Sequence, residues 1–391
     1  AAWTRAKETN NWKLFEPDLS TLLEISRKIA DIMMERMELD CQLDAFMDMW
    51  EPKMTTKLIS GVFSDLRKKL VPLTKKFQSA CSDIKVDFKK RTVPIHIQRE
   101  LVTDLANVMG YDTTSKDSGG RIDESEHPFT IGYYDDVRFT IHYQEDDLFR
   151  AVFGGLHETG HALHHQNQNS AWKWMMLGKS CSSGFSESQS RFVENIIGRS
   201  SEFWKYYYPH FLELTKGIFN DISYQEILQA INIVDASKIR VLADEMTYAL
   251  HIIIRFEIEE DLFSEKISVS EIPSIWNEKY DEYLGVKIET DTEGALQDVH
   301  WSWAYWGYFP TYALGNLYAA MLDEKMTSDI PDWKIQVSGG EISNVVHWLT
   351  DNVHKKSNLY DPPEMIGKIT GKSLTAEPFI KYLSEKYSQI F

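Results

Sequence analysis

Apolar residues recur at three- and four-residue spacing along most of this chain, which is the pattern of amphipathic helices. The pattern covers residues 12–48, 54–77, 93–109, 195–214, 224–233 and 238–263. One short region is different: residues 129–134 and 137–143 are rich in β-branched and aromatic side chains and flank Asp135-Asp136, which predicts a β-hairpin. The pattern therefore predicts a mostly α protein with one small β element.

The segment after the hairpin contains HETGH at residues 157–161, in what we predict to be one long helix with Asp146 or Asp147 as N-cap. Residues four apart lie on the same face of a helix, so His157 and His161 can bind a single metal ion. Glu158 lies beside them and can reach a metal-bound water. This is the HExxH arrangement of zinc-dependent peptidases, in which the glutamate is the general base.

A third metal ligand is expected on a separate element, because a catalytic zinc keeps three protein ligands and one open position for water. Glu187 is the leading candidate, since the turn-rich residues 182–184 allow a second helix to return beside the first. Glu194 in the same segment is the alternative. The purely structural interpretation of Glu187 is a glutamate favoured by the dipole at a helix start.

Arginines and aromatic residues further along the chain offer substrate contacts. Arg240 and Arg255 lie in the run 238–263; an arginine buried near a metal can grip a carboxylate, although most helix arginines face water. The aromatic-dense residues 296–320 are typical of a core. His300 and Tyr312 within this segment could still donate hydrogen bonds to an oxyanion.

Charge and cysteine content narrow the class of protein. The formal charge of -17 argues against nucleic acid or an anionic membrane as a partner. The three cysteines form no CxxC pair, which fits a reducing cytoplasm. No apolar run approaches the about 18–20 residues of a membrane span. We therefore expect a soluble, cytoplasmic protein.

The sequence shows no internal repeat, low-complexity linker or charge block that would mark a domain boundary. We therefore predict a single helical peptidase domain over residues 1–391. Within it, residues 1–125 form a helical lobe without recognised motifs. Residues 126–391 form the lobe with the metal site and the substrate motifs.

Six motifs in chain order together resemble one family, the M32 metallocarboxypeptidases or thermostable carboxypeptidase 1-like enzymes. The motifs are HPF at 127–129, DxRxT at 136–140, HETGH at 157–161, the ESQ of HESQ at 187–189, IRxxAD at 239–244 and GxxQDxHW at 294–301. The resemblance implies a large, helical, deeply clefted metallopeptidase fold with a small sheet beside the HExxH helix. Members of the family commonly form homodimers.

The resemblance also implies roles for individual residues. His157, His161 and Glu187 would bind Zn²⁺, with Co²⁺ as the alternative metal, and Glu158 would be the general base. Arg240 would bind the free α-carboxylate of a peptide, and Arg138 would shape the closed end of the groove. His300 and Tyr312 resemble, in spacing, an oxyanion-stabilising pair in related oligopeptidases. The predicted substrate-binding residues are Arg240, Arg138, Tyr308 and Gln297.

Two departures from the family pattern are visible. Ser186 stands where the family has histidine, so we expect a contact to the metal site or to substrate to be lost. Family members also usually begin with further helices, which help to wall the cleft, before the point where this chain starts. The predicted function is a zinc-dependent carboxypeptidase of broad specificity for peptides. The alternatives are an oligopeptidase or dipeptidase of the gluzincin type, or a catalytically impaired, metal-binding relative that acts as a binding protein.

Overall fold

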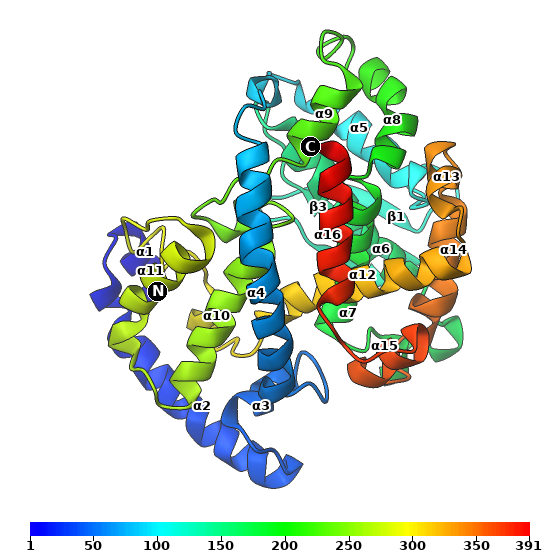
Figure 1. The fold of residues 1–391 in the computed structure, drawn as a ribbon. Coiled ribbons are helices and arrows are strands. Elements are labelled where there is room, and N and C mark those ends of the chain that lie inside the picture. The colour runs from blue at the N-terminus through cyan, green and yellow to red at the C-terminus, as the bar shows by residue number, and fades with distance from the viewer. The chain divides into compact units, whose positions relative to one another are not determined.

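A computed structural model describes all 391 residues of the chain (Figure 1). The chain divides into two compact units, each built from separate segments. Unit 1 contains residues 1–81, 234–314 and 375–380, and unit 2 contains residues 82–233, 315–374 and 381–391. The unit boundaries do not coincide with the predicted lobe boundary at residue 125. The single domain stays a prediction.

Unit 1 is built from helices around α10 (Tyr248–Phe263), which packs against α4 (Thr56–Ala80) and α11 (Ile272–Leu284). Apolar residues of α10 such as Ile253 and Phe256 are completely buried, and so are its charged residues Arg255 and Glu259. A helix surrounded by other elements is apolar over most of its surface. Burying a charged side chain in such surroundings costs free energy, so Arg255 and Glu259 need polar or charged partners. The remaining helices of unit 1 are α1 (Ala2–Glu8), α2 (Glu16–Met37) and α3 (Gln42–Met47).

The predicted run of helix over residues 238–263 is wrong in its first third. The side chain of Asp244 accepts hydrogen bonds from the backbone N–H groups of Met246 and Thr247, at 2.9 and 3.0 Å. Such local side-chain bonds compete with helical hydrogen bonds and favour a turn. The helix therefore begins at Tyr248, and Arg240 lies in a short 3₁₀ turn, Arg240–Leu242.

Unit 2 contains a three-stranded sheet in the order β1-β3-β2. β2 (Thr130–Tyr133) and β3 (Asp136–Ile141) form the predicted antiparallel hairpin, and Val137, Phe139 and Ile141 of β3 are buried. β1 (Gly120–Glu124) pairs in parallel with β3 and was not predicted from the sequence. Its residues, GRIDE, hold one apolar side chain and show no alternation, so nothing in the pattern marked a strand.

The central helix of unit 2 is α6 (Leu148–Gln166), which contacts the sheet, α5 (Ile95–Val108) and α7 (Ser183–Arg191) (Figure 1). The side chain of Asp147 accepts from the backbone N–H of Arg150, which confirms the predicted N-cap. A Cβ atom at Gly160 would lie 2.4 Å from the carbonyl oxygen of Gln189, so glycine allows α6 and α7 to approach closely. The HETGH helix is therefore held between a sheet and a helix.

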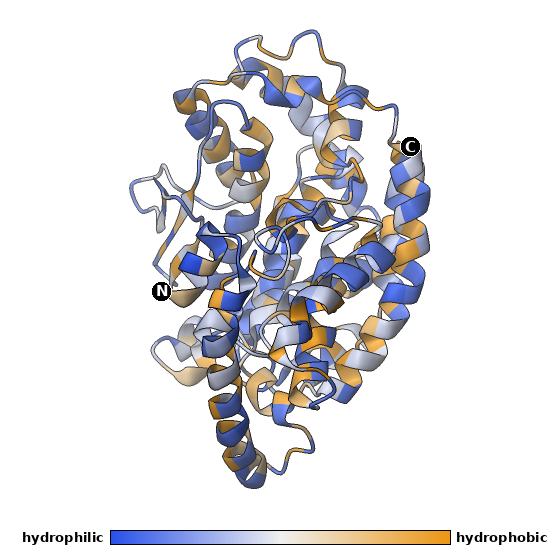
Figure 2. Ribbon diagram, turned by 90° about the vertical axis from the view of Figure 1, so that its left-hand side faces the viewer, coloured by the Kyte–Doolittle hydropathy of each residue, from blue (hydrophilic) through white to orange (hydrophobic).

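The other helices of unit 2 carry mixed hydrophobic and hydrophilic faces, as Figure 2 shows for the structure as a whole. None of the helices combines the length and the apolar character needed to cross a bilayer. The remaining elements are a π-helix (Phe192–Ile197), α8 (Ser201–Leu214), α9 (Tyr224–Ile231), α13 (Trp333–Ser338), α14 (Ser343–Asn352) and α15 (Pro362–Thr370), with α12 (Pro310–Asp329) and α16 (Glu377–Ile390) contributing residues to both units.

Candidate active site

The metal-binding side chains predicted from the sequence lie together in unit 2. His157 and His161 come from α6 and Glu187 comes from α7, and one potential ligand atom of each lies within 4.8 Å of the others. Oε2 of Glu187 is 3.7 Å from Nε2 of His157 and 3.4 Å from Nε2 of His161. Two imidazole nitrogens and a carboxylate are a donor set typical of catalytic zinc.

Both histidines are held by their other ring nitrogen. Nδ1 of His157 is 3.0 Å from Oε2 of Glu194, and Nδ1 of His161 is 3.1 Å from Oγ of Ser186. These partners favour the tautomers with a proton on Nδ1, which leaves each Nε2 lone pair free to bind a cation. Ser186 therefore contacts a candidate metal ligand, so this position keeps a contact to the metal site, and the expected loss of a substrate contact stays a prediction.

Two arginines neutralise the carboxylates around the histidines. Nε of Arg191 donates to Oε1 of Glu187 at 2.7 Å, and both Arg191 and Arg199 lie within 3.3 Å of Glu194. Burial alone would raise the pKa of Glu187, but Arg191 and the histidines outweigh it and hold the pKa well below the usual range. Arg191 likewise outweighs burial at Glu194 and lowers its pKa to about 2. Both carboxylates are therefore ionised at neutral pH.

Glu194 reaches His157 because its segment is a π-helix, Phe192–Ile197, which directly follows α7. A π-helix holds more residues per turn than an α-helix and occurs frequently at functional sites. The sequence offered Glu194 only as an alternative ligand, and no pattern in it predicts the π-helix. Gly315 of α12 also supports the site, since a Cβ atom there would lie 2.5 Å from Cγ of Glu187.

The predicted general base, Glu158, is buried and is held by the hairpin. Oγ1 of Thr130, on β2, donates to Oε2 of Glu158 at 2.6 Å. Because β2 packs against α6, the small sheet fixes the direction of this carboxylate. Thr130 was not predicted as a site residue, since nothing in the sequence connects a strand threonine to a glutamate 28 residues later.

A second charged cluster lies in unit 1 around Asp298. Oδ1 of Asp298 accepts from Nε and Nη2 of Arg240 at 3.0 and 2.8 Å, and its Oδ2 accepts from Nε of Arg255 at 2.7 Å. Burial would raise the pKa of Asp298, but the two arginines outweigh it and keep the pKa far below the usual range. Arg240 also donates from Nη1 to the hydroxyl of Tyr248 at 3.1 Å. Arg240 is therefore buried and fixed in direction.

The amide of Gln297 joins the same cluster. Its Oε1 accepts from the backbone N–H of Arg240 at 2.9 Å and from Nη2 of Arg255 at 2.8 Å. Its Nε2 donates to the carbonyl oxygens of Lys238 and Glu293. The side chain of Gln297 thus holds Arg240 in place.

His300 and Tyr312 also meet in unit 1, with Nε2 of His300 3.3 Å from the hydroxyl of Tyr312. Burial lowers the pKa of His300 to about 4, against the opposing effect of Asp298. The imidazole is therefore neutral at pH 7 and has one N–H to donate. Tyr308 packs its ring against both residues, with ring centroids 5.6 and 5.3 Å away.

Arg138 lies on β3 of unit 2 with its guanidinium paired to the carboxylate of Asp136 at 2.7 and 2.9 Å. Its side chain is 48% exposed. The structure thus brings His157, His161, Glu187 and Glu158 together in unit 2, beside the sheet that carries Arg138. It brings Arg240, Gln297, His300, Tyr308 and Tyr312 together in unit 1.

Comparison with known proteins decides the family. The sequence model of the Carboxypeptidase Taq (M32) metallopeptidase family matches residues 1–387. The chain belongs to the M32 family. It is 40% identical to Carboxypeptidase 1 of Bacillus subtilis, over 100% of this chain and 77% of that protein, and 33% identical to Thermostable carboxypeptidase 1 of Thermus thermophilus, with the same coverage.

Solved structures agree with this membership. The M32 carboxypeptidase from Deinococcus radiodurans matches 100% of this chain and 77% of its own, with a TM-score of 0.94 and 33% identity. The Trypanosoma cruzi metallocarboxypeptidase 1 matches with a TM-score of 0.93 at 30% identity, over 99% of this chain and 77% of its own. The protein is thus an M32 metallocarboxypeptidase, and the predicted mostly helical fold with a small sheet is confirmed.

Proposed function

We propose that this M32 metallocarboxypeptidase is a zinc enzyme in which His157, His161 and Glu187 bind the metal. The observation that carries the proposal is the convergence of three ligand atoms within 4.8 Å, with both histidines oriented through Nδ1. Cobalt has similar ligand preferences and is the alternative metal. When bound, zinc supplies an acidic water, whose pKa falls toward about 7, and polarises a carbonyl group.

Glu158 is the proposed general base. Glu158 directly follows His157 in the sequence. The hydrogen bond from Thr130 to Oε2 leaves Oε1 of Glu158 available to accept a proton from water. Glu158 takes this proton as the water attacks the last peptide bond and passes it to the leaving amine. The hydrogen bond from Thr130 restricts the conformations of the Glu158 carboxylate. Reaching the transition state therefore costs less conformational entropy.

Arg240 is proposed to bind the free carboxylate at the C-terminus of the peptide. The cluster of Arg240, Arg255 and Asp298 holds two guanidinium groups and one carboxylate, so it keeps one positive charge that a substrate carboxylate can balance. Gln297 acts through Arg240, which it positions. This pairing would fix the register of the peptide so that only the final residue lies beyond the metal.

The other proposed contacts have less support from the geometry. His300 and Tyr312 would donate to the oxyanion, and the neutral imidazole and phenol are suited to that role. Tyr308 would line the substrate groove beside them. Arg138 would shape the closed end of the groove while its guanidinium group stays paired with the carboxylate of Asp136.

Partners and location follow from the resemblance and the composition. We propose peptides with a free C-terminal carboxylate and broad side-chain specificity as substrates, and a homodimer as the assembly. The three cysteines Cys41, Cys81 and Cys181 form no disulfide bond, which supports a cytoplasmic location. The net charge of -17 supports a partner other than nucleic acid or an anionic membrane.

Mass spectrometry of a peptide incubated with the protein, combined with metal analysis, tests the proposal. We expect bound zinc and stepwise loss of residues from the C-terminus of a free-acid peptide, with the C-terminally amidated peptide cut far more slowly. Internal cuts would support an oligopeptidase instead. Bound metal without any cleavage would support the catalytically impaired relative.

A further inference from the structure

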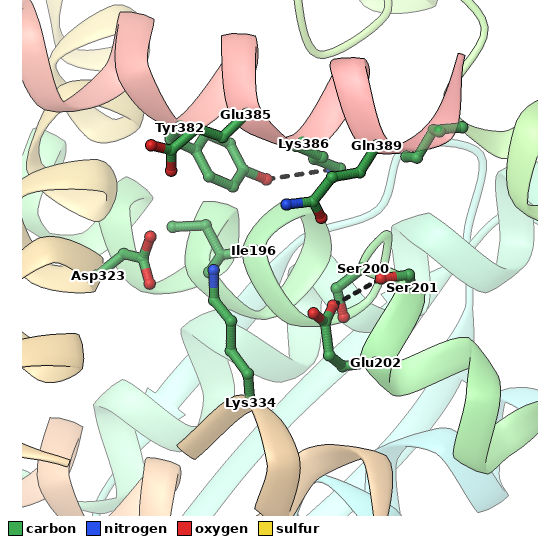
Figure 3. A pocket seen from close by; sticks show the side chains of 11 residues that line it. Ile196, Ser200, Ser201, Glu202, Asp323, Lys334, Tyr382, Glu385, Lys386 and Gln389 are labelled. Carbon is green, nitrogen blue, oxygen red and sulfur yellow. Dashed lines mark hydrogen bonds between the residues drawn. The ribbon is translucent and has the colours of Figure 1, made fainter. Parts of the chain in front are cut away.

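Unit 2 contains a polar pocket formed by residues other than those of the metal centre (Figure 3). It lies between α8, α12, α13 and the C-terminal part of α16, next to the π-helix. Its empty volume is about 550 Å³, which includes the opening to solvent. Only about 60 Å³ of this space can hold the centre of a water-sized molecule, so the pocket suits a ligand of few non-hydrogen atoms.

Asp323 is the unusual group in this pocket. Its side chain is directed into the space, only 8% of the residue is exposed, and its Oδ1 has no hydrogen-bond partner (Figure 3). Burial raises the pKa of Asp323 to about 6, Lys334 and a hydrogen bond with Thr327 act in the opposite direction, and Glu385 and Glu202 raise it further. A buried carboxylate oxygen without a partner costs free energy, which a bound cationic group would recover.

Lys334 supplies the opposite charge from α13. It is exposed, forms no ion pair, and its ammonium group lies 5.5 Å from the ring centroid of its neighbour Trp333. Figure 3 shows Lys334 directed toward the same space as Asp323, with the amide of Gln389 facing them from α16. Asp323 and Lys334 thus face a common space without forming an ion pair with each other, and Glu202, Glu385 and Lys386 line it as well.

We propose that this pocket binds a free α-amino acid as a zwitterion, with its ammonium group on Asp323 and its carboxylate on Lys334. Such a ligand satisfies both charged groups at once, and the amide of Gln389 can bind either end. Ile196 and Ile390 offer apolar contacts for its side chain. A divalent cation is the competing ligand, because Glu202 and Glu385 also line the pocket, but Lys334 and Lys386 would repel it.

An α-amino acid is also what a carboxypeptidase releases at each turnover. The link to product release rests on the carboxypeptidase activity, whereas the binding of a free amino acid to this pocket does not depend on it. The pocket adjoins the metal centre through the π-helix: Tyr382 and Lys386, which line it, donate to the carbonyl oxygen of Asn195 at 3.1 and 3.2 Å. Asn195 directly follows Glu194, which orients His157. The product would therefore bind against the element that supports the metal site.

Isothermal titration of the metal-loaded protein with L-alanine at pH 7.5 tests the proposal. We expect Asp323→Asn and Lys334→Met each to weaken one alanine site about tenfold or more, as expected when one charged contact is lost. Glu324→Gln on the same helix and Lys325→Met are the matched controls, and both should leave the affinity unchanged. Ethylamine and propionate, which carry only one of the two charges, should bind at least tenfold more weakly than alanine.

Three results would overturn the proposal. These are unchanged alanine binding in both variants, ethylamine or propionate binding as tightly as alanine, and Mn²⁺ binding that Asp323→Asn abolishes. Alanine bound at the metal centre does not involve Asp323, so that binding would survive in both variants. Loss of folding is controlled by thermal melting and by Lys334→Met, which changes an exposed residue. The assay reads binding only, so a failure of the proposed metal chemistry would be seen separately in peptide hydrolysis.

Discussion

In the histidine–glutamate cluster of unit 2 and the arginine–aspartate cluster of unit 1 no side chain is more than 20% exposed, but the charged groups are partnered differently. In unit 1, each oxygen of Asp298 already accepts from an arginine. In unit 2, the Nε2 atoms of His157 and His161 face Oε2 of Glu187 at 3.7 and 3.4 Å, and the ring protons are engaged elsewhere. The arginine–aspartate cluster is held together by its own charges, whereas the histidine–glutamate cluster offers three acceptors to a cation.

This difference predicts how each cluster responds to substitution. Removing a side chain from the histidine–glutamate cluster should lower metal affinity and activity more than it lowers stability. Removing the carboxylate from the arginine–aspartate cluster leaves two buried positive charges, so it should lower the free energy of unfolding. Measurements of metal content, activity and stability on the same variants would show whether the two clusters differ in this way.

The largest effect is expected for Glu187→Gln. A neutral amide is a weak zinc ligand, so the variant should lose its metal and lose activity by about 1,000-fold or more, which corresponds to about 4 kcal/mol of barrier. Glu213→Gln, at an exposed position of α8, is the control and should keep both. Full metal content in the Glu187 variant would remove this residue from the ligand set.

Asp298→Asn should have the next largest effect, a loss of about 3–5 kcal/mol in the free energy of unfolding at pH 7. The pKa of Asp298 is lowered in the folded state, so its contribution is present above the unfolded pKa of about 3.9 and lost as the pH falls through the folded pKa. Denaturant unfolding should therefore show the full loss from pH 9 to 5 and a smaller one below about pH 4. Glu289→Gln, which breaks an exposed ion pair with Lys238, should cost under about 1 kcal/mol. Equal losses for the two variants would contradict the account.

Arg240→Ala should reduce kcat/KM for a free-acid peptide by about 100-fold, because a charge-assisted bidentate contact to the substrate is lost. Cleavage of the amidated peptide, which has no terminal carboxylate, should change by less than about threefold. Asp298 keeps its bond to Arg255 in this variant, so the structure should be retained. Similar losses for both peptides would show that Arg240 does not recognise the carboxylate.

Ser186→Ala should have the smallest effect, a loss of metal affinity at the lower end of the about 10- to 100-fold range seen for groups that orient metal ligands. The reason is that a hydroxyl is a weaker acceptor than a carboxylate. Glu194→Gln, which changes the charged partner of His157, should lie at the upper end of that range. A competition titration with a zinc chelator measures both, and an effect of Ser186→Ala above that of Glu194→Gln would contradict this ranking.

The sequence predicted the regular secondary structure of this molecule and missed the features that depend on tertiary contacts. The spacing of apolar residues predicted the helices and the hairpin, and HETGH predicted two ligands because both histidines lie on one helix. Glu187 could be ranked first, but its distance to the histidines depends on how α7 packs against α6. Thr130 and the π-helix had no signal, since their contacts join segments that are distant in sequence. The side chain of Asp244 delays the start of the predicted helix to Tyr248 through hydrogen bonds that apolar spacing does not describe.

Glu158→Gln provides the most direct test of the proposed metal centre, when metal content and peptide hydrolysis are measured on the same preparation. The amide can still accept the hydrogen bond from Thr130, so the geometry of the site should be kept. We predict zinc content equal to that of the unchanged protein and hydrolysis reduced by about 100- to 10,000-fold, the usual contribution of a general base. Hydrolysis at the original rate with metal bound would contradict the assignment of Glu158 as the base.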